Sequence, residues 1–156
     1  MGIQEREMTE GEYARVKAGF DRYAIECGNP PEKSDRFGFV ASEDGQFVGC
    51  SSGLAYKKLV GYADWFYLSD LFVEKPYRGR DIGSQLLHCL ERKVAAMGIG
   101  HIWTWTAGYE APSFYRKLGY EVFCEMPGYY SSGHSRIGLR KALDRNRVGP
   151  GVRREA

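Results

Sequence analysis

The feature that most constrains the fold of this chain is a strand–helix–strand pattern near its middle. The segment Asp64–Val73 is apolar and aromatic on both faces, which is typical of a central strand covered on both sides. A helix is predicted from about 80–82 to Met97, because apolar residues recur along one face and Gly98 follows as a stop. His101–Thr106 has the composition of a second buried strand. Strands joined through a helix pair in parallel, so we expect a parallel pair here.

The remaining elements flank this unit. They are, in chain order, a helix over Thr9–Cys27, strands over Phe37–Ala41 and Gln46–Tyr56, a helix over Glu110–Leu118, and strands over Tyr120–Glu125 and Arg136–Ala142. The first two strands flank the turn Glu43-Asp44-Gly45 and are predicted to form a hairpin. This order of elements predicts an α/β or α+β sheet with helices on its faces.

Length and charge limit the classes of function. The chain has 156 residues, enough for one domain over 1–143, and the polar segment 144–156 is predicted to be a mobile tail. Lys and Arg number 22 against 20 Asp and Glu, so the net charge of +2 argues against a dedicated nucleic-acid binder. The four cysteines are each more than twenty residues apart, and no metal site is expected.

The N-terminal segment and the lengths of the apolar runs bear on the compartment. Residues 1–10 are charged, and they lack the apolar stretch of a secretory signal. No apolar run approaches the roughly 20 residues that span a bilayer. We therefore expect a cytoplasmic protein without a membrane partner.

The segment from Leu71 to Leu87 carries the chemical information. It predicts a strand end, a turn with Arg78 and Arg80 around Gly79, and the start of a strong helix. Unpaired N–H groups at a helix N-terminus, glycines and arginines together favour an anion such as a pyrophosphate. An ordinary strand-to-helix turn with solvent-facing arginines is the alternative. Neither the Gly-x-x-x-x-Gly-Lys nor the Gly-x-Gly-x-x-Gly motif is present here.

Two motifs carry a resemblance to a known family. Arg78 to Gly83 resembles the Arg/Gln-x-x-Gly-x-Gly/Ala signature of the GNAT superfamily, the acetyl-coenzyme A-dependent N-acetyltransferases, after a Val-x-x-x-x-Arg-Gly lead-in. Ala111 to Tyr120 is similar to a downstream segment of the same family. The resemblance covers roughly Thr9 to Leu143. It implies a GNAT-like mixed, centrally splayed β-sheet flanked by helices.

The resemblance also implies a site for acetyl-coenzyme A. Backbone groups of Leu71, Phe72 and Val73 would pair with the pantetheine arm of the cofactor. The pyrophosphate would lie on N–H groups from about Gly79 to Ser84, with added charge from arginines. The implied cofactor-binding residues are Leu71, Phe72, Val73, Arg78, Gly79, Arg80, Asp81, Ile82, Gly83 and Ser84.

The sequence departs from the family pattern at two positions. Asp81 stands where the family usually has glycine, and it brings negative charge near the proposed pyrophosphate while favouring the helix dipole. Gly108 stands seven residues ahead of Tyr115, where many members carry an asparagine that contacts the cofactor. No asparagine contact is therefore expected.

Direct acetyl transfer needs a deprotonated amine, donors for an oxyanion, and an acid for the departing thiolate. Tyr115 occupies the family's general-acid position, and a phenol pKa of about 10 suits a thiolate. Its alternative role is packing of the helix on the sheet. Asp70 is the leading candidate base, because a carboxylate in an apolar strand should have a raised pKa. Strand-end hydrogen bonding or pairing with an arginine is the alternative.

Further candidates for the reaction lie in the backbone and in the loops. The oxyanion donor is expected to be the backbone N–H of Phe72 or Val73. His134 is an alternative base, although a loop histidine is often solvated, and His88 and His101 are expected to be structural. Aromatic side chains that could line an acceptor site, or belong to the core, are Trp65, Tyr67, Trp103, Trp105, Tyr129 and Tyr130.

The sequence therefore predicts an N-acetyltransferase that moves acetyl from acetyl-coenzyme A to a primary amine of a small molecule or peptide. A non-catalytic acyl-coenzyme A-binding or regulatory module is the alternative, with Asp81 and Gly108 as marks of a changed site. Nucleic-acid binding through Arg145–Arg154 is a third reading. The acceptor and the length of the acyl group stay open. Homodimers are common for the fold, although no residue here specifies an interface.

Overall fold

The protein is described by a computed structural model over residues 2–29 and 31–144. It divides into two compact units, one up to Lys33 and one from Ser34 onward. The single domain over 1–143 stays a prediction. The predicted tail 144–156 lies, from residue 145 on, outside the described residues, and so does the basic segment Arg145–Arg154. Within the described ranges, no helix combines the length and apolar character needed to cross a membrane.

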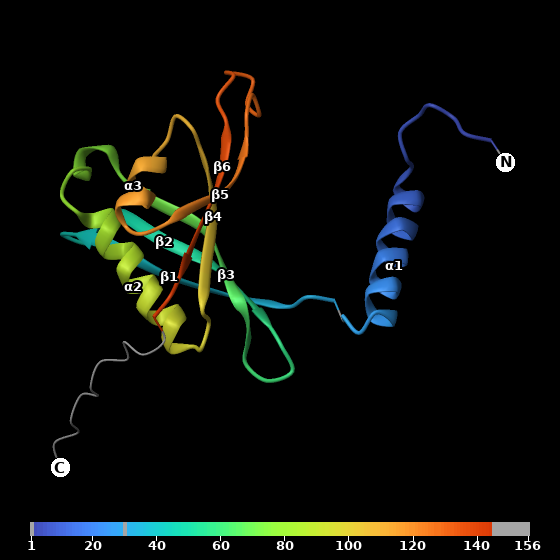
Figure 1. The fold of residues 1–156 in the computed structure, drawn as a ribbon, viewed down its shortest axis with the longest axis horizontal. Coiled ribbons are helices and arrows are strands. Elements are labelled where there is room, and N and C mark those ends of the chain that lie inside the picture. The colour runs from blue at the N-terminus through green and yellow to red at the C-terminus, as the bar shows by residue number, and fades with distance from the viewer. Residues whose placement is uncertain (1, 30, 145–156) are drawn as a thin grey trace, which may run out of the picture. The chain divides into compact units, whose positions relative to one another are not determined.

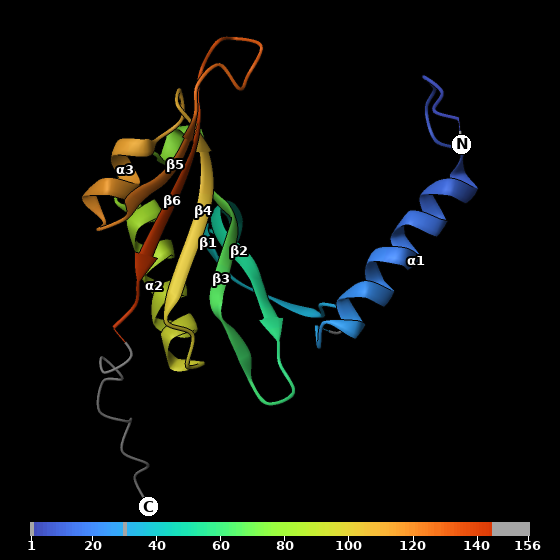
Figure 2. The same cartoon turned by 45° about the vertical axis from the view of Figure 1, so that its right-hand side comes forward.

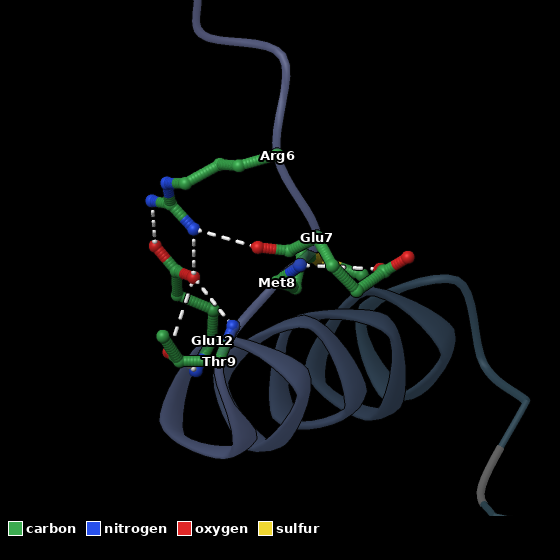
Figure 3. Close-up of polar contacts among 5 residues, drawn as sticks. All are labelled: Arg6, Glu7, Met8, Thr9 and Glu12. Carbon is green, nitrogen blue, oxygen red and sulfur yellow. Dashed lines mark hydrogen bonds and ion pairs between the residues drawn. The ribbon is translucent and has the colours of Figure 1, made fainter.

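The first unit is built around α1 (Glu10–Glu26), within the predicted range. Its N-terminus is a capping box: Thr9 Oγ1 accepts from the Glu12 N–H at 3.3 Å, and Glu12 Oε2 accepts from the Thr9 N–H at 2.8 Å (Figure 3). Arg6 donates to both carboxylate oxygens of Glu12, at 2.7 and 2.8 Å. These bonds, led by the one from Arg6, lower the pKa of Glu12 to about 2. The start of α1 is thus fixed by local hydrogen bonds.

The second unit is a six-stranded mixed sheet with helices, in the strand order β1-β2-β3-β4-β6-β5 (Figure 1). Its elements are β1 (Ser34–Glu43), β2 (Gln46–Lys57), β3 (Tyr62–Val73), the 3₁₀ turn η1 (Lys75–Tyr77), α2 (Ile82–Ala96), β4 (His101–Ala107), α3 (Pro112–Lys117), β5 (Glu121–Met126) and β6 (Arg136–Ala142). All neighbouring strands are antiparallel except β3 and β4, which are parallel. The predicted element order, hairpin and parallel pair are confirmed.

The core of this unit lies on one face of the sheet, where α2 and α3 pack (Figures 1 and 2). Phe66 and Leu68 of β3 are buried there. Trp65 and Phe72 point the other way and are 39% and 42% exposed. Within this unit, the expectation that β3 is covered on both faces is therefore wrong. The sequence pattern misled because rings on the open face stack on one another, as Trp65 does on His101 at 4.4 Å.

A buried polar network ties α2 to β6. The Glu91 side chain accepts from Lys141 Nζ at 2.9 and 3.0 Å and from the Tyr120 hydroxyl at 3.1 Å. Burial, and then the negative charge of Glu91, raise the pKa of Tyr120 well above its usual value. Because these groups are paired, a carboxylate is accommodated at the edge of an otherwise apolar core.

Candidate active site

The sheet opens between β3 and β4, as the resemblance implied. Backbone pairing covers three positions, from Trp65 opposite His101 to Tyr67 opposite Trp103. Beyond these positions, the next hydrogen bond between the two strands comes from a side chain: Thr104 Oγ1 donates to the Leu68 carbonyl at 2.9 Å. The strands then separate, although β3 continues to Val73 and β4 to Ala107. This opening leaves strand backbone available to a ligand.

The backbone of β3 presents alternate residues to this opening. The Glu74 N–H donates to the Val48 carbonyl at 2.8 Å, on the β2 side. Backbone N–H and C=O groups of successive residues point to opposite sides of a strand. Those of Phe72 therefore also point to β2, whereas those of Leu71 and Val73 point to the opening. The Val73 carbonyl accepts from Arg78 Nε at 3.0 Å. Of the two predicted oxyanion donors, the Val73 N–H is therefore the one directed at the open side.

A first cavity of about 870 Å³ occupies this opening. Its lining residues are Leu71, Phe72, Val73, Tyr77, Arg78, Gly79, Asp81, Ile82, Gly83, Ser84, Thr106, Tyr109, Glu110, Ala111, Phe114 and Tyr115. Every predicted cofactor-binding residue is among them except Arg80. The Arg80 guanidinium lies over the Tyr77 ring, 5.1 Å from its centroid, and 3.4 Å from Glu43. The structure therefore brings together the predicted segment but directs Arg80 elsewhere.

The turn before α2 has the backbone geometry that an anion site requires. Gly79 and Asp81 both have left-handed backbone angles, with φ of 79° and 62°. Asp81 makes no side-chain capping bond, and the first turn of α2 contains no acidic residue. The first N–H groups of a helix have no intrahelical acceptor, so they suit a phosphate group. The left-handed angle also gives a physical reason why glycine is usual where this chain has Asp81.

A second cavity of about 370 Å³ adjoins the first. Its lining residues are Tyr67, Ser69, Asp70, Leu71, Phe72, Thr104, Trp105, Thr106, Ala107, Glu110, Tyr115, Tyr130 and Arg136. The residues that line both cavities are Leu71, Phe72, Thr106, Glu110 and Tyr115. The two cavities thus meet at Tyr115, an arrangement that suits a reaction between two bound molecules.

Tyr115 is 8% exposed and packs against Phe114 and Tyr120 while lining both cavities. Burial, and then the negative charge of Glu110, raise the pKa of its phenol to about 12, against a smaller lowering by a hydrogen bond with Thr104. The expectation of an ordinary pKa near 10 is therefore wrong. The phenol keeps its proton throughout the neutral range.

Asp70 lines the second cavity, but its surroundings differ from those expected. Its carboxylate is 56% exposed, lies 3.3 Å from Arg36 Nη1, and accepts from the Ser69 hydroxyl at 2.6 Å. The premise of an apolar environment is therefore wrong. The pairing with an arginine, the alternative reading, is what the structure has. Its role as a base stays a prediction.

Glu110 is a carboxylate at the site that sequence reasoning missed. Its Oε2 accepts from Thr106 Oγ1 at 2.8 Å and from the Ala107 N–H at 3.0 Å. No hydrogen bond among the described residues uses its other oxygen, Oε1. A carboxylate five residues ahead of the predicted acid Tyr115, between a strand end and a helix start, was the available signal. Its position at both cavities makes it a second candidate base.

The predicted aromatic acceptor residues divide into two groups. Those that line the second cavity are Tyr67, Trp105 and Tyr130, and those that line neither cavity are Trp65, Trp103 and Tyr129. His134 also lines neither cavity. It is exposed in the connection between β5 and β6, with Nδ1 3.0 Å from Ser132 Oγ. The geometry therefore favours the carboxylates over His134 as bases.

Comparisons with known structures identify the fold. An acetyltransferase from Bacillus cereus is 23% identical, with a TM-score of 0.73 over 90% of this chain and 98% of that chain. An aminoglycoside 6'-N-acetyltransferase complexed with coenzyme A is 22% identical, with a TM-score of 0.58 over 77% of each chain. The ribosomal-protein-S18-alanine N-acetyltransferase of Escherichia coli has the same TM-score at 17% identity, over 78% of this chain and 76% of that one.

Comparisons of sequence identify the family. A curated relative, an L-ornithine N5-acetyltransferase from Arabidopsis thaliana, is 33% identical in an alignment of 63 residues that covers 38% of this chain. The chain spans 27% of that relative's length. The model of the acetyltransferase (GNAT) domain matches residues 34–122, more than half of the chain. Together with the opened sheet and the two cavities, this match shows that the chain belongs to the GNAT family of acetyltransferases.

Proposed function

We propose that this protein is an N-acetyltransferase that moves acetyl from acetyl-coenzyme A to a primary amine by direct attack. The observation that carries the proposal is the meeting of two cavities at Tyr115, with a carboxylate, Glu110, at the same junction. Two substrates bound side by side can react without a covalent enzyme intermediate. The name of the Arabidopsis relative, which refers to an amine of ornithine, supports an amine acceptor.

The first cavity is the proposed site of acetyl-coenzyme A, which supplies the acetyl group as a thioester. Leu71 and Val73 present backbone groups to the pantetheine arm, and the Val73 N–H is the proposed oxyanion donor. The pyrophosphate is held by the turn at Gly79 and the first N–H groups of α2. Arg78 adds positive charge beside them. Arg80 is not part of this set, because it does not line the cavity.

In the proposed reaction, the amine nitrogen first forms a bond to the carbonyl carbon of the acetyl group, which places negative charge on the oxygen near the Val73 N–H, and the carbon–sulfur bond then breaks as the carbonyl re-forms. One proton leaves the nitrogen for a carboxylate, and the sulfur leaves as coenzyme A thiolate. Glu110 is the proposed acceptor of that proton because it lines both cavities and its Oε1 is not engaged. Asp70, which Arg36 and Ser69 already engage, then orients the acceptor, directly or through water.

Tyr115 donates its O–H to the departing sulfur in this mechanism. A thiol has an ordinary pKa of about 8.5, so a phenol with a pKa of about 12 gives up its proton uphill. The proton is therefore shared in a hydrogen bond that stabilises the thiolate, and solvent completes its protonation. Tyr115 thus keeps the acid role that the sequence suggested, but it acts as a hydrogen-bond donor to the thiolate and does not transfer its proton completely.

The test is thiol release and acetylated product on mixing the protein with acetyl-coenzyme A and a panel of amines. Thiol release that depends on an amine, with the mass of the acetylated amine, supports the proposal. Calorimetry with acetyl-coenzyme A is the companion measurement. Tight binding without turnover of any amine would favour the non-catalytic module, and absence of binding would contradict both readings.

A further inference from the structure

The second cavity contains a cation that is paired with no acidic side chain in the described part of the chain. Arg136, the first residue of β6, lines this cavity and not the first one. Its Nη1 donates to the hydroxyl of Tyr129 at 2.7 Å. Its Nε is buried without a hydrogen-bond partner. No ion pair among the described residues includes Arg136.

Aromatic rings hold the guanidinium in place. Its central carbon lies 5.0 Å from the ring centroid of Trp105 and 5.0 Å from that of Tyr129. Stacking of this kind fixes the plane of a guanidinium and removes water from its faces. A partly buried cation with a neutral phenol as its hydrogen-bond partner is expected to attract an anion.

Arg140, four residues further along the same strand, shows the contrast. Its Nε donates to Glu121 at 2.8 Å, so its charge is neutralised within the protein. Both side chains start from the same face of β6, because side chains alternate along a strand. In the register with β5, Arg140 lies opposite Glu121, whereas Arg136 lies opposite Met126, so Arg136 has the Tyr129 hydroxyl but no acidic partner among the described residues.

The second cavity has an unpaired negative group and an unpaired positive group at different places in its lining, among the described residues. Its charged lining residues are Asp70, Glu110 and Arg136. Asp70 is paired with Arg36, so within residues 2–29 and 31–144 Glu110 and Arg136 stay without an oppositely charged partner. Glu110 also lines the first cavity, the proposed site of the acetyl donor, whereas Arg136 lines the second cavity and not the first. Arg136 lies opposite Ala107 in the register of β4 and β6, and the Ala107 N–H donates to the Glu110 carboxylate. Arg136 and Glu110 are therefore close neighbours.

We propose that the acceptor is an amino acid or a similarly small amine that bears a carboxylate, and that Arg136 binds this carboxylate. The proposal rests on the proposed function. An amine directed toward Glu110 and a carboxylate on Arg136 neutralise both unpaired groups at once. A cavity of about 370 Å³ is at the small end of ligand sites, which fits an acceptor of this size. Polyamines and lysine side chains within proteins lack the carboxylate.

The experiment compares acceptors that differ by the carboxylate alone. L-ornithine is paired with putrescine, L-lysine with cadaverine, and each amino acid also with its amide. We expect kcat/KM to be about tenfold to a hundredfold higher for the carboxylate members, as for one charge-assisted pair. Arg136→Gln should remove this preference by raising KM for the amino acids, with little change for the diamines. Arg136→Lys should restore part of it. Arg140→Gln is the matched control and should leave the preference unchanged.

Equal use of the paired acceptors, or an equal loss for both after Arg136→Gln, would overturn the proposal. If no amine in these sets or in the wider panel is acetylated, the proposed function fails, and calorimetry with the coenzyme A-bound protein then decides the carboxylate site. Binding of L-ornithine or L-lysine, but not of their amides, that Arg136→Gln abolishes would retain the site. Absence of that difference would overturn it. Unchanged acetyl-coenzyme A affinity and thermal unfolding show that the variant is folded.

Discussion

Tyr115 and Glu110 line the same junction between two cavities, where burial and then the charge of Glu110 raise the pKa of the Tyr115 phenol to about 12. The two side chains are thus coupled: removing the charge of one changes the acidity of the other. This coupling gives a measurable signature that does not depend on the identity of the acceptor.

Replacing Glu110 with Gln removes the charge and keeps the shape of the side chain. We expect the pKa of Tyr115 to fall from about 12 toward its usual value, because the carboxylate no longer opposes the phenolate. Absorbance titration of tyrosinate, with Tyr115→Phe to identify the signal, measures the change. Glu125→Gln on exposed β5 is the control. An unchanged Tyr115 titration in the Glu110 variant would contradict the coupling.

Replacing Tyr115 with Phe should lower kcat by about 10²- to 10⁴-fold, the usual range for a positioned acid, with little change in acetyl-coenzyme A affinity. Unchanged turnover in a folded Tyr115→Phe protein would exclude the role.

The pH dependence of the wild type gives an independent check. A group whose pKa is raised to about 12 keeps its proton below that pH, so the acid form is lost only as the pH rises through about 12. Between pH 7 and 10, the rate should therefore not fall through deprotonation of Tyr115. A descending limb near pH 10 that disappears in the Phe variant would contradict the raised pKa.

Replacing Asp81 with Gly should stabilise the protein by up to about 1 kcal/mol. A left-handed backbone costs a non-glycine residue roughly 1–2 kcal/mol, and the added flexibility of glycine offsets roughly 0.5–1 kcal/mol of the relief. Acetyl-coenzyme A affinity should stay the same or rise, because a negative charge leaves the cavity wall. Asp44→Gly is the matched control, since Asp44 is also left-handed (φ of 50°) but does not line the cavity.

Urea unfolding and calorimetry measure these two effects of Asp81→Gly. A clear loss of acetyl-coenzyme A affinity in the Asp81 variant, with the Asp44 variant unaffected, would refute the placement of the pyrophosphate at this turn.

Replacing Lys141 with Met should destabilise the fold by about 3–5 kcal/mol, because Glu91 is left as an uncompensated charge beside the core. The double variant Glu91→Gln/Lys141→Met should recover much of this loss, since the amide removes the charge and still accepts from Tyr120. Thermal or urea unfolding measures both. Equal destabilisation in the single and double variants would show that Lys141 acts through packing instead.

The sequence was most informative where local patterns decide the structure. The apolar spacing along α2 and its stop at Gly98 predicted the helix, and the glycine turn before it predicted the segment that lines the first cavity. Asp70 could not be judged in this way, because its partner Arg36 comes from β1, two strands away in the sheet. The surroundings of a strand residue depend on its neighbours in the sheet, which no local spacing reveals.

Glu110 and Arg136 were missed for a related reason. Neither belongs to the recognised motif, and their importance depends on which cavities they line after β4 and β6 have paired. The raised pKa of Tyr115 likewise comes from burial and from a charge, and both depend on tertiary packing. The segment that lines the first cavity was therefore predictable apart from Arg80, whereas the charges that line the second cavity required the structure.

The opening between β3 and β4 also has a mechanical consequence. One half of the sheet, β1-β2-β3, is joined to the other, β4-β6-β5, through three backbone-paired positions and the Thr104 bond to Leu68. A molecule that forms hydrogen bonds with the unpaired backbone of β3 while contacting β4 would make this connection between the two strands more rigid. Amide hydrogen exchange should therefore slow on both strands when acetyl-coenzyme A is added, even where the strands do not touch it. We therefore expect the donor substrate, once bound, to hold the two halves of the sheet together.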